Sequence, residues 1–522
     1  MRSSGPWLWA TALVACVPFL RLGSDLERGF EYLFYQRLVD DAFYYFEISR
    51  HIPEFNVGIP CSGFHPLYLF MVAPLHRLWP PEPAVVGSLW LLVSAQAAGA
   101  LVLYRLLGRL WAAPIAFTGA AVWACSGQLY SVAVTGTEGV LAALFVVLFF
   151  ARFVRCAAVS VGVVSSSDLA SLGALCGLAF LARMDSPIIL APALLWLGVR
   201  LVRRGRFRAA GLLWGCAAAL PLAWIAYIYS VTGSPFPTSG AALRLSGTLG
   251  GPLVPWWRVA TQAAALIRDA VAYVAPGGWF LAGAILLVMT VGAVGGVWAL
   301  EGSGAIGDFR QVVRFSWLVL GGSVLWLMYY ALIQGVVQHW YVAQLALLVY
   351  GVALPLMLAL MHRILPGRLA LTVGAAVSVG LAANSLPRAP LYPQEYDKYR
   401  AAGVLNELSR RGRLDKKVGA FNTGILNYFA EVDVINLDGV VNPKALEALA
   451  KDDMPRYVKD AGIGYLVEHE FGQAVNLHWL RDDERFALTP LIDLTKSYPP
   501  YEGHKGTPTL LWKVDVSRYE RR

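Results

Sequence analysis

Residues 341–361 read YVAQLALLVYGVALPLMLALM, a run of 21 residues without a charged side chain. A helix needs about 20 apolar residues to cross the hydrocarbon core of a bilayer. Similar runs recur up to residue 385 and predict a polytopic α-helical membrane protein. We expect about eleven transmembrane helices, near 6–22, 84–106, 111–131, 139–154, 168–183, 187–201, 209–230, 279–300, 315–335, 341–361 and 367–385.

The composition separates two parts of the chain. Of the 522 residues 57% are hydrophobic and only 15% are charged, whereas soluble domains carry about 25% charged residues. This excludes a soluble globular enzyme, a disordered chain and a nucleic-acid binder. Residues 386–522 hold 20 basic and 20 acidic groups, while residues 1–385 hold 23 arginines, no lysine and 14 acids. We therefore predict a membrane domain over 1–385 and a soluble domain over 386–522.

The arginines predict the orientation of the spans. Excess Lys and Arg mark the cytoplasmic ends of short loops, and a cytoplasmic N-terminus places 14 of the 23 arginines on that side. The first outside loop, about 24–83, has four arginines against eight acids, and its residues 64–79 suit an interfacial helix. An odd number of spans makes the C-terminal domain extracytoplasmic. We expect a multi-pass protein of the plasma (inner) membrane.

One competing pattern lies within the first span. Residues 13–16, LVAC, look like a lipoprotein processing site, whose cleavage would remove that span. The apolar residues that follow and the thin positive region before it favour an uncleaved helix.

The soluble part predicts a mixed α/β domain. Short β-rich runs occur at 417–421 (KVGAF), 432–437 (VDVINL), 462–469 (GIGYLVEH) and 509–515 (TLLWKVD), each next to Gly, Pro or Asp residues. Residues 443–461 read as helical between two of these runs. None of these segments carries a nucleotide-binding glycine loop.

The first outside loop contains an acidic pair with aromatic neighbours, in YQRLVDDAFYYFEISRHI (35–52). Asp40 and Asp41 stand at the start of a helical pattern, and Asp40 and Tyr44 fall on one face. A capped surface helix explains the pair structurally, because carboxylates favour helix N-termini. The functional alternative is a carboxylate just outside the bilayer, where one of two adjacent acids can serve as a base.

Other chemically active residues fall on the same outer side. Charged groups at membrane depth are costly and mark functional sites by default, although a helix cap, an ion pair or an aromatic belt explains each of them singly. Their joint position favours one outer-face site. The candidate binding residues are Tyr44, His65 in SGFHPLY, Glu138 in AVTGTEGVL, Arg183 and Asp185 in LARMDSP, and His339, Trp340 and Tyr341.

At these residues the chain resembles the GT-C superfamily of membrane glycosyltransferases, which use polyprenyl-phosphate sugars. The resemblance runs through VDDAFYYFEISRHI (39–52), GFHPLY (63–68), TGTEGVL (135–141), LARMDSP (181–187) and HWY (339–341). The phrase VGAFNTGILNYFAEVDVINLDGVVN (418–442) also looks like the extracytoplasmic domain of bacterial members. Among these, the chain is most similar to the arabinofuranosyltransferases and related envelope enzymes. The resemblance implies a GT-C fold.

The resemblance also implies an inverting transfer of a sugar from a polyprenyl-phosphate donor to an acceptor hydroxyl on an envelope glycan, lipid or protein. Asp40 matches the first acid of the family motif and is our first choice for the general base, with Asp41 second. Arg183 and His65 are candidates for binding the departing phosphate, and His339 is a weaker one. Glu138 is a candidate for binding sugar hydroxyls or for orienting the acceptor. Asp40→Asn is expected to abolish transfer while leaving folding and donor binding largely intact.

Two other matters stay open. The acids are adjacent, unlike the acid–any–acid spacing of the metal-requiring oligosaccharyltransferase branch, which leaves open whether a divalent metal takes part; we assign no metal ligands. A transporter or flippase of lipid-linked sugars also explains many spans, but not the soluble domain or acids confined to one side. An envelope scaffold predicts no cavity that joins Asp40, Glu138 and Arg183.

Overall fold

The fold is taken from a computed structural model. It describes residues 5–56, 58–159, 163–247, 308–334, 338, 340–364, 393–469, 487–497 and 508–515. The predicted spans near 279–300 and 367–385, as well as His339, lie outside the described residues.

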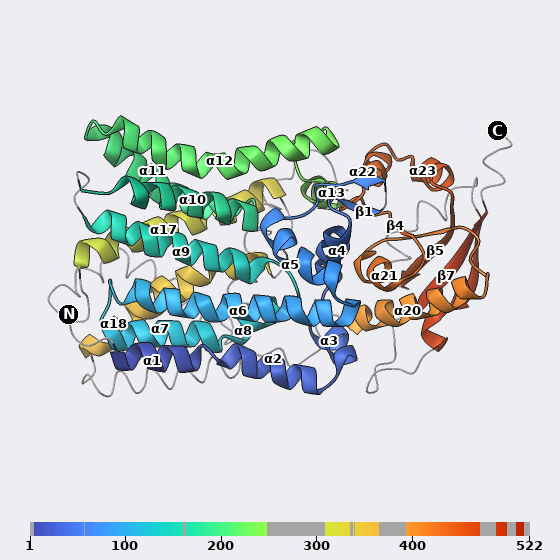
Figure 1. The fold of residues 1–522 in the computed structure, drawn as a ribbon, viewed down its shortest axis with the longest axis horizontal. Coiled ribbons are helices and arrows are strands. Elements are labelled where there is room, and N and C mark those ends of the chain that lie inside the picture. Colours follow the sequence, from blue (N-terminus) through green and yellow to red (C-terminus); the bar gives the residue numbers. More distant parts are fainter. Residues whose placement is uncertain are drawn as a thin grey trace. The chain divides into compact units, whose positions relative to one another are not determined.

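The chain divides into two compact units, each built from separate stretches of sequence (Figure 1). The membrane unit comprises Met1–Ser24, Leu89–Trp224 and Pro252–Pro387. The loop-and-tail unit comprises Asp25–Ser88, Ile225–Gly251 and Arg388–Arg522. The acidic loop and the C-terminal tail therefore belong to one compact unit, although more than 300 residues separate them in sequence.

The membrane unit is made of helices that follow the apolar runs. In a helix, the backbone N–H and C=O groups of these long uncharged stretches form hydrogen bonds with one another, as a bilayer requires. Three of the helices, α2, α6 and α12, continue into the other unit. The helices are α1 (Gly5–Val14), α2 (Val17–Glu27), α6 (Pro81–Leu107), α7 (Ala113–Cys125), α8 (Gly127–Val134), α9 (Gly139–Ala158), α10 (Ser166–Ala182), α11 (Ser186–Arg203), α12 (Phe207–Thr232), α17 (Phe309–Tyr329), η2 (Tyr330–Gln334), η3 (Tyr341–Leu345), η4 (Leu347–Ala353) and α18 (Leu354–Ile364).

Seven helical segments within the described residues are long and apolar enough to cross a membrane. They coincide with seven of the predicted spans. Two other predicted spans correspond to shorter apolar helices, Ala113–Cys125 and Ser166–Ala182. The first of these ends early because Ser126 leaves helical geometry, and its side chain accepts the N–H of Leu129 to cap the next helix, α8.

The helices α9, α10 and α11 of this unit lie side by side (Figure 1). Helices α9, α10 and α11 pack against one another, and α11 also packs along α17. Gly322 of α17 permits that last contact, because a Cβ there would collide with the backbone of Ile189. As a result, the start of α9, the turn from α10 to α11 and the end of α17 meet at one end of the unit.

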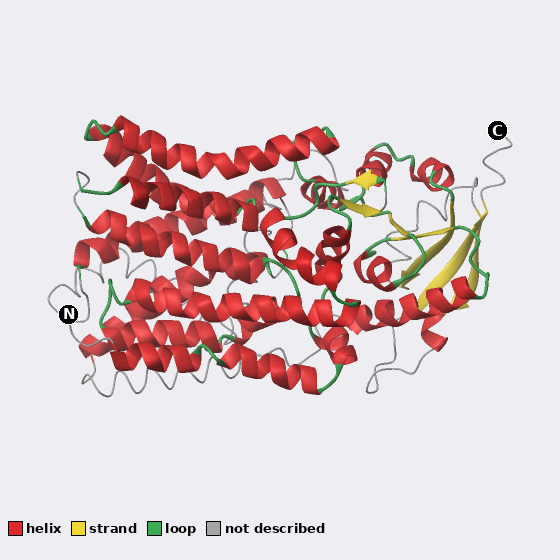
Figure 2. Cartoon of the chain, in the orientation of Figure 1, coloured by secondary structure: helices red, strands yellow, loops and turns green. Residues whose placement is uncertain are grey.

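The loop-and-tail unit is mixed α/β, as predicted for its tail (Figure 2). The loop predicted at about 24–83 supplies three helices and a small hairpin, and the tail supplies the main sheet. The elements are α3 (Phe30–Gln36), α4 (Asp40–Arg50), β1 (Glu54–Asn56), β2 (Ile59–Pro60), α5 (Pro66–Leu78), α13 (Thr238–Gly247), α20 (Pro393–Arg410), β3 (Lys417–Ala420), α21 (Gly424–Phe429), β4 (Val434–Asn436), α22 (Pro443–Ala450), α23 (Met454–Asp460), β5 (Ile463–His469), β6 (Ala487–Asp493), η5 (Leu494–Ser497) and β7 (Thr509–Asp515).

The tail sheet has five strands in the order β4-β3-β5-β7-β6. β3 pairs in parallel with β4 and β5, whereas β7 pairs antiparallel with β5 and β6. Alternate residues face opposite sides, as strand geometry requires: Val418 and Tyr465 join the core shared with α20 and α21, while Ile435 and Leu466 join the core shared with α23. Helices therefore cover both faces of the sheet.

The four β-rich runs expected in the tail are strands β3, β4, β5 and β7. The helix expected over 443–461 is instead two helices, because Asp452 adopts a left-handed backbone (φ 54°) between α22 and α23. Such a conformation ends a right-handed helix and is tolerated by Asp better than by most residues.

Candidate functional site

Asp40 is the first residue of α4, as the loop motif predicted. Val39 before it is extended, so the helix begins with two acidic residues in its first turn. The Asp40 side chain is buried. Its two carboxylate oxygens accept the backbone N–H groups of Gly424 and Ile425, each at 2.9 Å. Asp40 thus caps the first turn of α21, a helix of the tail.

Gly424 is required at this contact. A Cβ atom at residue 424 would lie far inside contact distance of the Asp40 carbonyl oxygen. The glycine of the tail phrase FNTGIL (421–426) therefore permits the close approach of α21 to the start of α4. The two motifs that carried the resemblance in the loop and in the tail are in direct contact.

A buried lysine from α20 completes the surroundings of Asp40. Lys398 Nζ lies 3.4 Å from an Asp40 carboxylate oxygen and 3.0 Å from Glu395. Burial raises the pKa of Glu395 to about 7, opposed by Lys398 and reinforced by Asp40. Burial also raises the pKa of Asp40, while Lys398 and the two N–H donors oppose the rise. Both Asp40 oxygens are thus held by internal donors.

Asp41 and Tyr44 occupy the same helix in different environments. The Asp41 side chain is only partly buried, whereas Tyr44 is buried. The Tyr44 hydroxyl donates to Asp438 at 3.0 Å. Burial, together with Asp438, Asp40 and Asp41, raises the pKa of Tyr44 well above its ordinary value. Three carboxylates therefore act electrostatically on one phenol.

Asp438 was not among the predicted site residues. It lies two residues after the end of β4, at the carboxyl end of parallel strands, where ligand-binding residues often lie in open α/β sheets. That position was the signal that could have found it. Its other carboxylate oxygen accepts the Val440 N–H at 2.8 Å. Asp438 is partly exposed, like Asp41.

His65 lies in the same unit. It is the N-cap residue of α5, in an extended conformation, and its side chain is partly buried. Pro66 and the apolar helix that follows fix the backbone at this point. His65 thus marks the change from the polar loop to the apolar helix predicted at 64–79.

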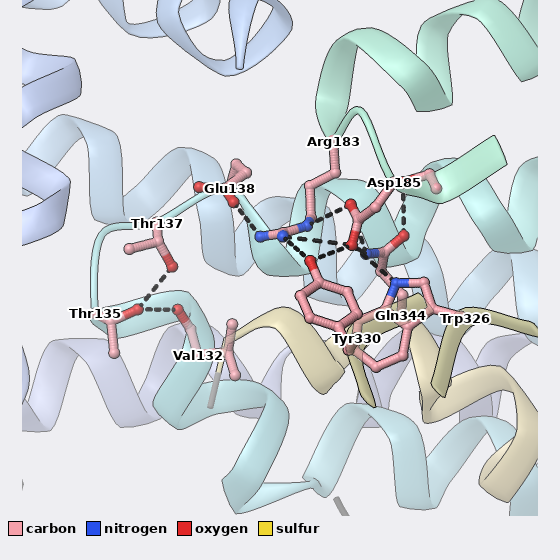
Figure 3. Close-up of polar contacts among 10 residues, drawn as sticks. Val132, Thr135, Thr137, Glu138, Arg183, Asp185, Trp326, Tyr330 and Gln344 are labelled. Atoms are coloured by element: carbon pink, nitrogen blue, oxygen red, sulfur yellow. Dashed lines mark hydrogen bonds and ion pairs between the residues drawn. The ribbon is translucent and has the colours of Figure 1, made fainter. Parts of the chain in front are cut away.

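In the membrane unit, Arg183 joins two predicted acids in a buried network (Figure 3). Its guanidinium donates to Glu138 at 2.5 Å and, through Nε, to Asp185 at 2.9 Å. Glu138 immediately precedes α9, and Arg183 and Asp185 form the turn between α10 and α11. The convergence expected of these three residues is therefore present, and the trio carries a formal charge of −1.

Four more residues of the network were missed by the sequence analysis. Asp185 accepts hydrogen bonds from Trp326 (2.8 Å), Tyr330 (2.7 Å) and Gln344, and Ser186 donates to Gln344 at 2.6 Å. Two signals could have found them. Trp326 and Tyr330 share a helix face at a spacing of four, and Gln344 is a polar residue inside an apolar run.

The aromatic pair after His339 contacts the same network. The Tyr341 ring lies 3.9 Å from the Arg183 guanidinium carbon, a cation–π contact. Trp340 is buried, and its carbonyl oxygen lies where a side chain on Gly139 would be. Tyr341 therefore covers the cation that the two acids hold.

The structure groups the predicted site residues into two sets. One set, in the loop-and-tail unit, contains Asp40, Asp41, Tyr44 and, elsewhere in that unit, His65. The other, in the membrane unit, contains Glu138, Arg183, Asp185, Trp340 and Tyr341. Among the described residues no three His, Cys, Asp or Glu side chains converge in a manner that fits a metal ion.

Comparisons with known proteins identify the fold. No family model and no curated protein matches the sequence. Two similar solved structures are crystal structures of the oligosaccharyltransferase of Archaeoglobus fulgidus. One, tethered to an acceptor peptide with an NVT sequon, is 13% identical, with a TM-score of 0.52 over 99% of this chain and 74% of that one.

The other, in complex with Zn and sulfate, is also 13% identical, with a TM-score of 0.51 over 90% of this chain and 68% of that one. At this identity the likeness establishes the fold. The similarity to arabinofuranosyltransferases stays a prediction. The predicted fold class is confirmed: the chain is a polytopic helical membrane protein with the GT-C fold and a C-terminal α/β region.

Proposed function

We propose that the protein is a GT-C glycosyltransferase that moves a sugar from a polyprenyl-phosphate donor to an acceptor hydroxyl outside the plasma membrane. The GT-C fold supports the class of activity. The observation that carries the proposal is the acidic start of α4, where Asp41 remains partly exposed beside the buried Asp40. The arginine-rich end of the membrane unit supports a cytoplasmic placement of that end.

We assign the general base to Asp41, the second of the two candidates. A base must reach the acceptor hydroxyl within about 2.6–3.2 Å. Asp40 is buried, and both its oxygens already accept backbone N–H groups. Its contacts instead make it a positioning residue, which joins α4 to α21. Asp41 is the next residue of the same helix.

The proposed reaction is a direct displacement. Asp41 takes the proton of the acceptor hydroxyl while its oxygen forms a bond to the anomeric carbon. The bond from that carbon to the phosphate oxygen breaks, and its electron pair leaves with the prenyl phosphate. The configuration at the anomeric carbon is therefore inverted. Phosphate is a good leaving group and needs hydrogen-bond donors rather than a strong acid.

The charges favour different partners for the two sets of residues. Arg183 already donates to Glu138 and Asp185, and the net negative charge of that trio disfavours a phosphate. We assign the trio and Tyr341 to recognition of sugar hydroxyls, for which carboxylates and an aromatic ring are suited. His65 is then the better candidate for the phosphate of the donor.

A flippase is the alternative, but its usual mark is ionisable groups near the bilayer midplane. Glu138, Arg183 and Asp185 lie instead at helix ends. The position of the network thus favours a site at one membrane face over a pathway through the bilayer.

The test uses purified full-length protein and a panel of polyprenyl-phosphate sugars, with release of prenyl phosphate as the readout. Wild type should release it with at least one donor, and Asp41→Asn should lower the rate by at least about 100-fold at unchanged donor binding. Glu27→Gln, which alters an exposed acid of the same unit, should retain full rate. Flipping of labelled donor without release would favour the alternative.

A further inference from the structure

The arginine-rich end of the membrane unit contains a cavity of about 710 Å³. It lies where α11 ends and α12 begins, near the first turn of α10. Its wall is formed by Ser166, Gly205, Arg206, Phe207, Arg208, Ala209 and Leu212. The cavity is at the opposite end of the unit from Arg183 and Glu138 (Figure 1). It therefore does not belong to the site described above.

The cavity wall carries positive charge and no acid. Two of its residues, Arg206 and Arg208, are arginines, and the exposed Arg203 and Arg204 belong to the same turn. The nearest acid in sequence, Asp168, is paired with Arg152 at 2.8 Å. The electrostatic potential at the cavity is therefore positive and attracts an anion.

Hydrogen bonds hold the Arg206 side chain in one position. Both terminal nitrogens of its guanidinium donate to the Val164 carbonyl oxygen at 3.2 Å, across the loop that precedes α10. Gly205 provides the left-handed residue (φ 72°) that turns the chain into α12. One guanidinium on the wall is thus pre-positioned, which lowers the entropic cost of binding.

The apolar surroundings indicate that the anion carries hydrocarbon chains. Phe207 is 67% exposed on the wall, and Leu212 follows one turn later. Only 22% of the most apolar 18 residues of α12 are buried, compared with 67% for α9. Most side chains of α12 are therefore at least partly exposed and can contact lipid. The arginines lie at the start of this helix.

We propose that this cavity binds the headgroup of an anionic phospholipid. The phosphate lies between Arg206 and Arg208, whose guanidinium groups match phosphate oxygens, and the acyl chains lie along α12. A zwitterionic lipid places an ammonium among the arginines and binds more weakly. A soluble phosphate lacks the contact with Phe207 and α12.

The test measures phospholipid binding to the detergent-purified full-length protein by native mass spectrometry. Palmitoyl-oleoyl phosphatidylglycerol is compared with the phosphatidylcholine of the same chains, and glycerol phosphate is added as a soluble competitor. An arginine that contacts the phosphate of an anionic lipid contributes about fivefold to its binding, whereas an exposed arginine beside the cavity acts only through screening solvent. Arg206→Gln/Arg208→Gln should weaken phosphatidylglycerol binding at least tenfold.

The matched control is Arg203→Gln/Arg204→Gln, which removes the same charge from the same turn but not from the cavity wall. It should change binding less than threefold. Should the double cavity variant not fold, the exposed Arg208→Gln carries the test, with an expected loss of about fivefold. Equal losses in both pairs, equal binding of phosphatidylcholine, or displacement by glycerol phosphate would each overturn the proposal.

Discussion

The carboxylate of Asp40 accepts the backbone N–H of Gly424 at 2.9 Å across 384 residues of sequence. This contact ties the acidic loop to the tail within one compact unit. Since Asp41 is the next residue, its position depends on the same junction. The acid that we assign to catalysis is therefore supported by a segment near the other end of the chain.

Gly424→Ala should destabilise the loop-and-tail unit. The new Cβ would collide with the Asp40 carbonyl oxygen, which belongs to backbone and cannot rotate away. We expect a loss of about 1–3 kcal/mol, seen as a lower midpoint of thermal unfolding. Gly403→Ala in α20 is the control, because a Cβ there meets nothing within 4 Å, and its midpoint should stay or rise. A loss of equal size in both variants would contradict the steric explanation.

Asp40→Asn should lower stability as well as activity. It removes one of the two carboxylate partners of the buried Lys398 and points an amide donor at a backbone N–H, for an expected cost of about 3–5 kcal/mol. The midpoint of thermal unfolding measures the effect. Adding Lys398→Met should recover part of the loss, because the buried ammonium that has lost one of its two partners is then gone. Additive losses would refute the coupling between these two residues.

The stability of the loop-and-tail unit should fall as the pH rises from about 4.5 to about 7. Burial raises the pKa of Glu395 from 4.5 to about 7, and that of Glu47 likewise. The folded state therefore binds more protons than the unfolded state in this window, and its stabilisation is complete at lower pH and lost through pH 7. Each group contributes up to about 3 kcal/mol.

Thermal unfolding midpoints between pH 4 and pH 8 test this dependence. Glu395→Gln should flatten the slope, and Glu395→Gln/Glu47→Gln should flatten it further. An unchanged slope in the double variant would show that other groups cause it.

Arg183→Lys should damage the network of the membrane unit. An ammonium cannot donate in a fork to Asp185 while also reaching Glu138 and stacking on Tyr341. We expect a loss of about 2–4 kcal/mol and a rise in the KM for the donor sugar. Arg204→Lys, at an exposed position, should stay within about 0.5 kcal/mol of wild type. Wild-type KM in Arg183→Lys would remove the network from sugar recognition.

The sequence predicts elements well where one local pattern decides them. Apolar runs located seven of the predicted spans, and the strand Thr509–Asp515 was predicted with its observed bounds. β6 was missed because it contains Pro490, which weakens a strand prediction, yet it lies at the sheet edge, where a proline is tolerated. α20 was missed although Ala401, Leu405 and Leu408 repeat at helical spacing and face the core.

The site was predictable only where spacing carried information. LARMDSP places Arg183 beside Asp185, and the convergence of Glu138 with them was expected from the predicted topology, although no specific Arg183–Glu138 pair was. The partners of Asp40 could not be predicted, because no pattern links it to Lys398 or Gly424. Such contacts arise from tertiary packing. They bury Asp40 and leave Asp41 partly exposed.

The junction of Asp40 with Gly424 also has a consequence for biosynthesis. A ribosome that has completed the acidic loop must still translate several hundred residues before the two N–H donors exist. Until the tail has been synthesised and has folded, the Asp40 carboxylate lacks its two N–H donors, and α4 lacks its contact with α21. A chain terminated early would thus carry both acids yet remain immature, so that only complete molecules acquire the proposed activity.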